Sequence, residues 1–203
     1  MRRASLPAGD QVLVQIVDSA LEDATRRSGP WLACRPGCAQ CCFGVFSISQ
    51  LDAARLRHGL ADLEAREPLR ADAIRERARA AIVRLSGSYP GDPVTGILGD
   101  DDDAEARFAD FANDEPCPVL DPATRTCELY QSRPITCRAF GPPVRSEDGL
   151  GVCELCFQGA SDAETAECEM EVDPEDLESV LLREMEEAGA ASGRTIVAFA
   201  VSD

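Results

Sequence analysis

Hydrophobic residues recur at helical spacing in several stretches of the chain. Apolar positions three or four residues apart predict four amphipathic helices, over residues 11–27, 49–67, 74–85 and 173–189. We expect the second of these to falter at Gly59 or to end before Pro68. Residues 87–99 are rich in glycine and proline and predict a connecting loop. Residues 195–201 are apolar without a period, which is compatible with a strand or a helix.

An acidic run, Asp100 to Asp103, stands before Phe108 and Phe111. Carboxylates are favoured in the first turn of a helix, and the spaced ligand pattern of a calcium loop is absent. The run therefore predicts a helix start. The two phenylalanines, three positions apart, predict the buried face of that helix.

Prolines interrupt residues 117–157 so often that no long helix fits there. The fold expected is mainly α, a small single domain with an irregular, cysteine-rich metal-binding segment. Residues 1–160 are expected to form the helical cysteine-cluster domain. Residues 161–203 are expected to be an acidic C-terminal extension with one helix, packed on the same domain.

The composition excludes several classes of partner. Of 203 residues, 20 are Lys or Arg and 37 are Asp or Glu, which gives a net charge of -17. Such a field repels a nucleic-acid backbone and an anionic membrane surface, so we expect neither as a partner. No apolar stretch reaches the roughly 20 residues of a membrane-spanning helix and no secretory pattern is present, so we expect a cytoplasmic protein. The acidic residues of 162–187 fit solvation, and they also offer a surface to a basic protein partner.

The cysteine content is the most informative feature of the composition. The chain has ten cysteines. Thiols are kept reduced in the cytoplasm, so a disulfide framework is disfavoured and metal coordination becomes the leading interpretation.

The first cysteine cluster has the spacing C-x3-C-x2-C-C, with a proline and a glycine that favour a tight loop. Four thiolates so close together can converge on a metal centre, and both zinc and an iron–sulfur cluster such as [4Fe–4S] accept four of them. Radical S-adenosylmethionine enzymes hold their cluster with the same spacing as the first three cysteines. Those enzymes usually place an aromatic residue where this chain has Gln40, which argues against that class.

Further cysteines follow in the irregular segment, including a C-x2-C pair typical of a zinc knuckle. Nine cysteines thus stand in metal-ligand settings: Cys34, Cys38, Cys41, Cys42, Cys117, Cys127, Cys137, Cys153 and Cys156. Cys168 lies between two glutamates, which raise the pKa of a thiol, so we leave it out of the site.

The cluster Cys34-x3-Cys38-x2-Cys41-Cys42, followed by Cys117-Pro-Val-Leu, Cys127-x2-Tyr130, Arg133-Pro134 and Cys137-Arg138, resembles the YkgJ-like cysteine-cluster family of zinc- or iron-chelating domains. The resemblance spans about residues 31–157 and implies binding of zinc or an iron–sulfur cluster, with a structural or redox role. The family pattern also occurs in lysine N-methylases that act on flagellin. An enzyme or enzyme accessory in methyl transfer or protein modification is therefore the alternative function, although the chain has no glycine-rich nucleotide loop.

The nine cysteines suffice for two four-thiolate sites with one spare, or for one cluster and a less complete second site. We expect the N-terminal cluster and the segment from Cys117 to Cys137 to meet in space. Arg133 and Arg138 flank Cys137 and are candidates to bind a cofactor by donating to thiolates or to an anion; the alternative is a salt-bridged Arg-Pro turn. His58, the only histidine, is expected on a helix surface rather than on a metal.

Overall fold

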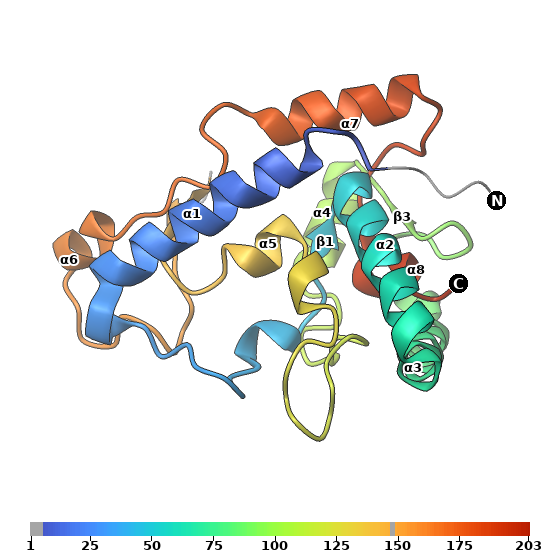
Figure 1. The fold of residues 1–203 in the computed structure, drawn as a ribbon, viewed down its shortest axis with the longest axis horizontal. Coiled ribbons are helices and arrows are strands. Elements are labelled where there is room, and N and C mark those ends of the chain that lie inside the picture. The colour runs from blue at the N-terminus through green and yellow to red at the C-terminus, as the bar shows by residue number, and fades with distance from the viewer. Residues whose placement is uncertain (1–5, 147–148) are drawn as a thin grey trace.

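The structure, a computed structural model, describes residues 6–146 and 149–203. These residues are mainly helical, which confirms the predicted fold class. The helices are α1 Asp10–Ser28, α2 Gln50–Arg66, α3 Pro68–Leu85, α4 Asp102–Ala109, α5 Ile135–Arg138, α6 Asp162–Glu167, α7 Leu177–Glu187 and α8 Val197–Ala200. In Figure 1, α1 and α7 lie side by side along one edge, α2 and α3 form a pair at the other, and irregular chain hangs below α1 and α5.

The strands in the described part of the chain are short and pair antiparallel. They are β1 Ser47–Ile48 with β6 Thr195–Ile196, β2 Gly91–Asp92 with β3 Ile97–Leu98, and β4 Val144–Ser146 with β5 Gly149–Gly151. Residues 87–99, expected as a connecting loop, thus contain the β2–β3 hairpin. Residues 195–201 contain both alternatives left open by their pattern, a strand followed by a helix.

Helix α1 follows the predicted stripe, and Leu13 and Val17 are fully buried on it. It ends at Ser28, and the cap residue that follows, Gly29, has a positive φ of 48°. Asp10, the expected cap, is instead the first helical residue. Its carboxylate turns inward to Arg55 on α2, which explains why it does not cap α1.

Helix α2 opens on the predicted cap, because the Ser49 hydroxyl accepts a hydrogen bond from the Asp52 amide at 3.2 Å. The helix does not falter at Gly59 but runs to Arg66, and Pro68 starts α3. Gly59 allows Ser132 to approach the backbone of α2 closely, because a Cβ at position 59 would lie 2.1 Å from the Ser132 hydroxyl oxygen. The neighbouring turn therefore packs directly on the backbone of α2.

The acidic run opens α4, as predicted, with the Asp101 carboxylate accepting a hydrogen bond from the Ala104 amide at 2.9 Å. The C-terminal region, expected to hold one helix, holds α6, α7 and α8. Helix α7 begins at Leu177, four residues after the expected cap, because Asp176 adopts a left-handed φ of 53°. Asp173 still caps it, since its carboxylate accepts from the Glu178 amide at 2.8 Å.

Two apolar clusters form most of the core. One lies among α2, α3 and α8 and includes Leu56, Ile74 and Val201. The other lies among α1, α2 and α7 and includes Val17, Leu51 and Leu181. Both clusters draw on residues from the C-terminal region. Among the described residues, none of the helices has the length and apolar character needed to cross a membrane.

Candidate metal centre

Two consecutive turns shape the N-terminal cysteine loop. The Cys38 amide donates to the Arg35 carbonyl and the Cys42 amide to the Ala39 carbonyl, each at 2.9 Å. Within the first turn, Gly37 has a φ of 87°, a conformation that glycine adopts without strain. The predicted Pro-Gly turn therefore exists, and it brings Cys38 back beside Cys34.

A backbone pairing joins this loop to the second cysteine segment. The Cys117 amide donates to the Cys42 carbonyl at 2.8 Å, and the Gly44 amide donates to the Glu115 carbonyl at 3.0 Å. Cys127 then pairs with Leu120 across a narrow turn, which brings it back beside Cys117. Cys137 follows on α5.

The C-x2-C pair forms a knuckle beside the same loop. The Cys156 amide donates to the Cys153 carbonyl at 2.8 Å, and the Cys156 sulfur accepts from the Ala33 amide at 3.4 Å. The Gln40 side chain donates to the Glu154 carboxylate at 2.5 Å. The C-x2-C pair is thus hydrogen-bonded to the N-terminal cysteine loop, although more than a hundred residues separate the two segments.

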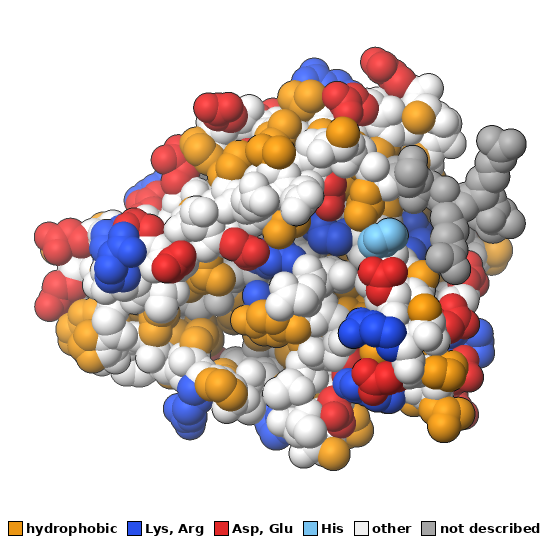
Figure 2. Space-filling model, in the orientation of Figure 1, with side chains coloured by type: hydrophobic (Ala, Val, Ile, Leu, Met, Phe, Trp, Pro, Cys, Tyr) orange, Lys and Arg blue, Asp and Glu red, His pale blue; other side chains and the backbone are white. Residues whose placement is uncertain are grey.

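A cavity of about 620 Å³ lies where these segments meet. Figure 2 shows the molecule hollowed here, with hydrophobic side chains, a class that includes cysteine, on its border. Eight cysteines line it: Cys34, Cys38, Cys41, Cys42, Cys117, Cys127, Cys137 and Cys153. None of the chain's cysteines forms a disulfide.

The thiols fall into two sets by their mutual influence. Burial, followed by the neighbouring thiols of Cys156, Cys38 and Cys153, raises the pKa of Cys34 to about 12. Burial, Cys156 and Cys38 likewise raise the pKa of Cys153. We name Cys34, Cys38, Cys153 and Cys156 the Cys34 group.

The other set is centred on Cys41. Burial raises the pKa of Cys137 well above its usual range, and Cys117, Cys41 and Cys127 add to this. Burial also raises the pKa of Cys117 to about 12, with contributions from Cys127 and Cys41. Cys41, Cys117, Cys127 and Cys137 are the Cys41 group, to which the N-terminal loop and the second segment both contribute.

Two cysteines are not counted in these sets of four: Cys42 adjoins the Cys41 group as a fifth thiol, and Cys168 lies apart from the cavity. Cys42 hydrogen-bonds with the Cys41 thiol and so raises the pKa of Cys41. Cys168 is buried in an apolar cluster with Cys153, Cys156 and Phe157, yet it does not line the cavity.

The donor chemistry of both sets suits a soft or borderline metal ion. Each set offers four sulfurs, the number that zinc and iron–sulfur clusters take. Burial and neighbouring thiols disfavour several thiolates at once, a penalty that a bound cation reverses. Across residues 6–146 and 149–203, however, no three His, Cys, Asp or Glu side chains already stand in metal-binding geometry. The thiols are neighbours that must still turn inward to share an ion.

Arg133 and Arg138 differ in their surroundings, although both line the cavity. The Arg138 side chain is 3% exposed and donates to Asp18 at 2.7 and 2.9 Å and to the Arg133 carbonyl at 3.1 Å. Arg133 stacks on the Tyr130 ring at 3.7 Å, and its charge lowers the pKa of Cys41 and of Cys127. Arg133 is therefore the cation that faces thiols, whereas Arg138 is held in an ion pair.

Some features of the site carry no sequence signal of their own. A Cβ at Gly141, whose φ is 127°, would lie 3.0 Å from the Cys34 sulfur, so this glycine leaves room for the thiol.

His58 has a 65% exposed side chain beside Asp62 and does not line the cavity, as expected of a surface histidine.

Comparison with known proteins adds one assignment. No curated protein and no solved structure matches the chain. A family model described as the CxxCxxCC putative zinc- or iron-chelating domain matches residues 33–169. The first cysteine spacing here is one residue longer than that name prints, because three residues separate Cys34 from Cys38. With most of its length and every cysteine that lines the cavity inside the match, the chain belongs to this family of zinc- or iron-chelating domains.

Proposed function

We propose that the protein holds two metal centres, one in each four-cysteine group, with zinc or an iron–sulfur cluster as the bound species. The Cys34 group would take one centre and the Cys41 group the other. This uses eight of the nine cysteines of the sequence prediction and leaves Cys42 as the spare. The role that follows is metal binding in support of the fold, or electron transfer if the species is an iron–sulfur cluster.

The observation that carries the proposal is the convergence of distant cysteines on one cavity, which is lined by three thiols of the Cys34 group and all four of the Cys41 group. A structural disulfide framework would pair them, and all ten are free thiols. Arg133 would offset part of the negative charge that four thiolates bring to the Cys41 group. So many reduced thiols also favour a reducing compartment, which is why we propose a cytoplasmic location.

Metal and acid-labile sulfide analysis of anaerobically purified protein, with its visible absorption spectrum, tests the proposal. Zinc without sulfide or colour would identify zinc centres, and iron with stoichiometric sulfide and a broad visible band would identify a cluster. Cys38→Ala and Cys137→Ala should each lower the metal content, while Cys168→Ala, outside both groups, should leave it unchanged. Wild-type protein with no bound metal, and none taken up on reconstitution, would refute the proposal.

A further inference from the structure

Cys137 sits on a helix that cannot support itself. Helix α5 has four residues, Ile135–Arg138, and its N-cap, Pro134, makes no side-chain capping bond. One helical turn is unstable in isolation because nucleation fixes several dihedral angles for a single hydrogen bond. The orientation of the Cys137 thiol therefore depends on what holds α5 from outside.

Asp52 holds the beginning of α5. Its Oδ1 accepts a hydrogen bond at 3.0 Å from the amide of Ile135, the first residue of α5. Asp52 belongs to the first turn of α2, far away in sequence, and its side chain is 3% exposed. It supplies from another helix the cap that Pro134 cannot provide.

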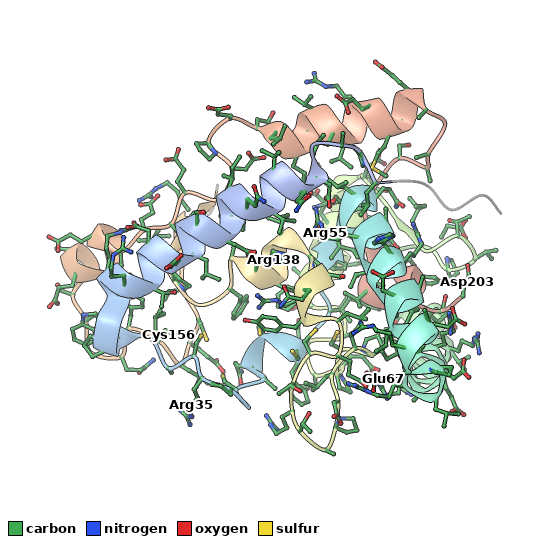
Figure 3. The ribbon with its side chains drawn as sticks, in the orientation of Figure 1. Arg35, Arg55, Glu67, Arg138, Cys156 and Asp203 are labelled. Atoms are coloured by element: carbon green, nitrogen blue, oxygen red, sulfur yellow. The ribbon has the colours of Figure 1, made fainter. Side chains whose placement is uncertain are left out.

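Arg55 fixes Asp52 in this role. Its Nη1 donates to the same Asp52 oxygen, while its Nη2 donates to Asp10 on α1 at 2.5 Å. The Arg55 side chain is 5% exposed, so this guanidinium is held between two buried carboxylates. In Figure 3 it lies where the first turn of α1 meets α2.

The other end of α5 is tied to α1. Arg138, the last residue of α5, donates to both carboxylate oxygens of Asp18. Figure 3 shows Arg138 beneath α1 and beside α5. Helix α2 thus hydrogen-bonds to the first residue of α5, and α1 forms an ion pair with its last residue, so the helix that carries Cys137 is held at both ends.

We propose that Asp52 is a positioning residue for Cys137 and so sets the metal affinity of the Cys41 group; this rests on the proposed function. A metal ligand binds well only when its surroundings fix its orientation, and loss of such support costs about 10- to 100-fold in affinity. Asp10 shares Arg55 with Asp52 but does not reach α5. It provides a matched control for loss of the ion pair alone.

The experiment titrates metal-free full-length protein with Co²⁺, whose sulfur-to-cobalt charge-transfer band reports thiolate ligation. Asp52→Ala should weaken the binding of one Co²⁺ by about 10-fold or more, and Asp10→Asn should leave both sites near wild type. In a Cys137→Ser background, Asp52→Ala should add no further loss. Equal losses in Asp52→Ala and Asp10→Asn, or an undiminished effect without Cys137, would overturn the proposal.

A measurement on the wild-type protein covers the case in which Asp52→Ala does not fold. Coupling between two sites is reciprocal, so metal binding must strengthen the Asp52–Ile135 hydrogen bond. Amide hydrogen exchange at Ile135 should slow when Co²⁺ is added, and unchanged exchange would overturn the positioning role. Wild-type protein that binds no Co²⁺, and takes up no iron and sulfide on reconstitution, would instead refute the proposed function and this proposal with it.

Discussion

The Cys117 amide donates to the Cys42 carbonyl at 2.8 Å, and this hydrogen bond joins two segments separated by 74 intervening residues. It places the end of the first cysteine cluster against the start of the second. The expectation that these segments meet in space agrees with this contact. The Cys41 group depends on it, because Cys41 comes from one segment and Cys117 from the other.

Removal of the metal should destabilise the protein. Eight thiols line a cavity of about 620 Å³. Without an ion, few other interactions would hold the segments around this cavity together, because metal–sulfur bonds would no longer connect them. We expect chelation under reducing conditions to lower the thermal midpoint and reduce helicity, measured by circular dichroism after metal loss is verified. An unchanged melting curve in metal-free protein would contradict a supporting role of the metal.

Single substitutions should separate the two centres. Cys34→Ser and Cys137→Ser lie in different groups, so each should remove one equivalent of metal and the double variant two. Metal content per chain, measured by elemental analysis with Cys168→Ser as control, checks this. Loss of both equivalents from either single variant would mean that the two groups form one centre.

Gly59→Ala should destabilise the protein, although alanine is the better helix former. The new methyl group would lie 2.1 Å from the Ser132 hydroxyl oxygen. Such overpacking costs about 1–3 kcal/mol, which exceeds the helix-propensity gain of about 1 kcal/mol. Urea unfolding should show the loss. Gly87→Ala, which has no atom within 4 Å of the new Cβ, is the control and should stay within about 0.5 kcal/mol of wild type.

Asp52 should make stability depend on pH between about 4 and 6. Burial raises its pKa from 3.8 to about 6, with a smaller contribution from Glu178, against the opposing effects of Arg55 and the Ile135 amide. The folded state then binds the proton on Asp52 more tightly than the unfolded state does. The contribution of this proton to the free energy of unfolding is therefore fully present below pH 4 and is lost as pH rises through 6. Relative to Asp52→Asn, the wild type should lose up to about 3 kcal/mol over this range.

Urea unfolding of both proteins at pH 4, 5, 6 and 7 measures that difference. Wild-type stability that rises with pH relative to the variant would mean that Arg55 dominates over burial.

The sequence predicts the long helices well because their signal is local. Apolar periodicity marks α1 and α3, and Ser49 marks the start of α2. The start of α7 escapes prediction, since Asp176 takes a left-handed conformation that no neighbouring residue demands. The continuation of α2 through Gly59 depends on packing against Ser132, a contact that local pattern does not contain.

The sequence names the candidate ligands of the site but not their arrangement. Residue type and spacing mark the cysteines as ligand candidates. Spacing alone does not say which thiolates share a centre, whereas in the structure Cys38 neighbours Cys153 and Cys41 neighbours Cys137. The partition follows from tertiary contacts of the segments after residue 117. The role of Asp52 could not be predicted from the sequence either, because only the tertiary fold brings its carboxylate to the start of α5.

The turn between Cys38 and Cys41 also limits how far apart two bound ions can be. Three peptide units keep the Cα atoms of Cys38 and Cys41 within about 11 Å of each other, even when extended, and here a 3₁₀ turn from Gln40 to Cys42 shortens the path. The cysteine side chains and the metal–sulfur bonds add a few ångströms at each end. Salt at 0.1 M screens charges over a comparable distance of about 10 Å, and it screens buried charges less than exposed ones. Ions held by the two groups would therefore feel each other's field, so filling one centre would change the affinity of the other, and added salt would weaken that communication.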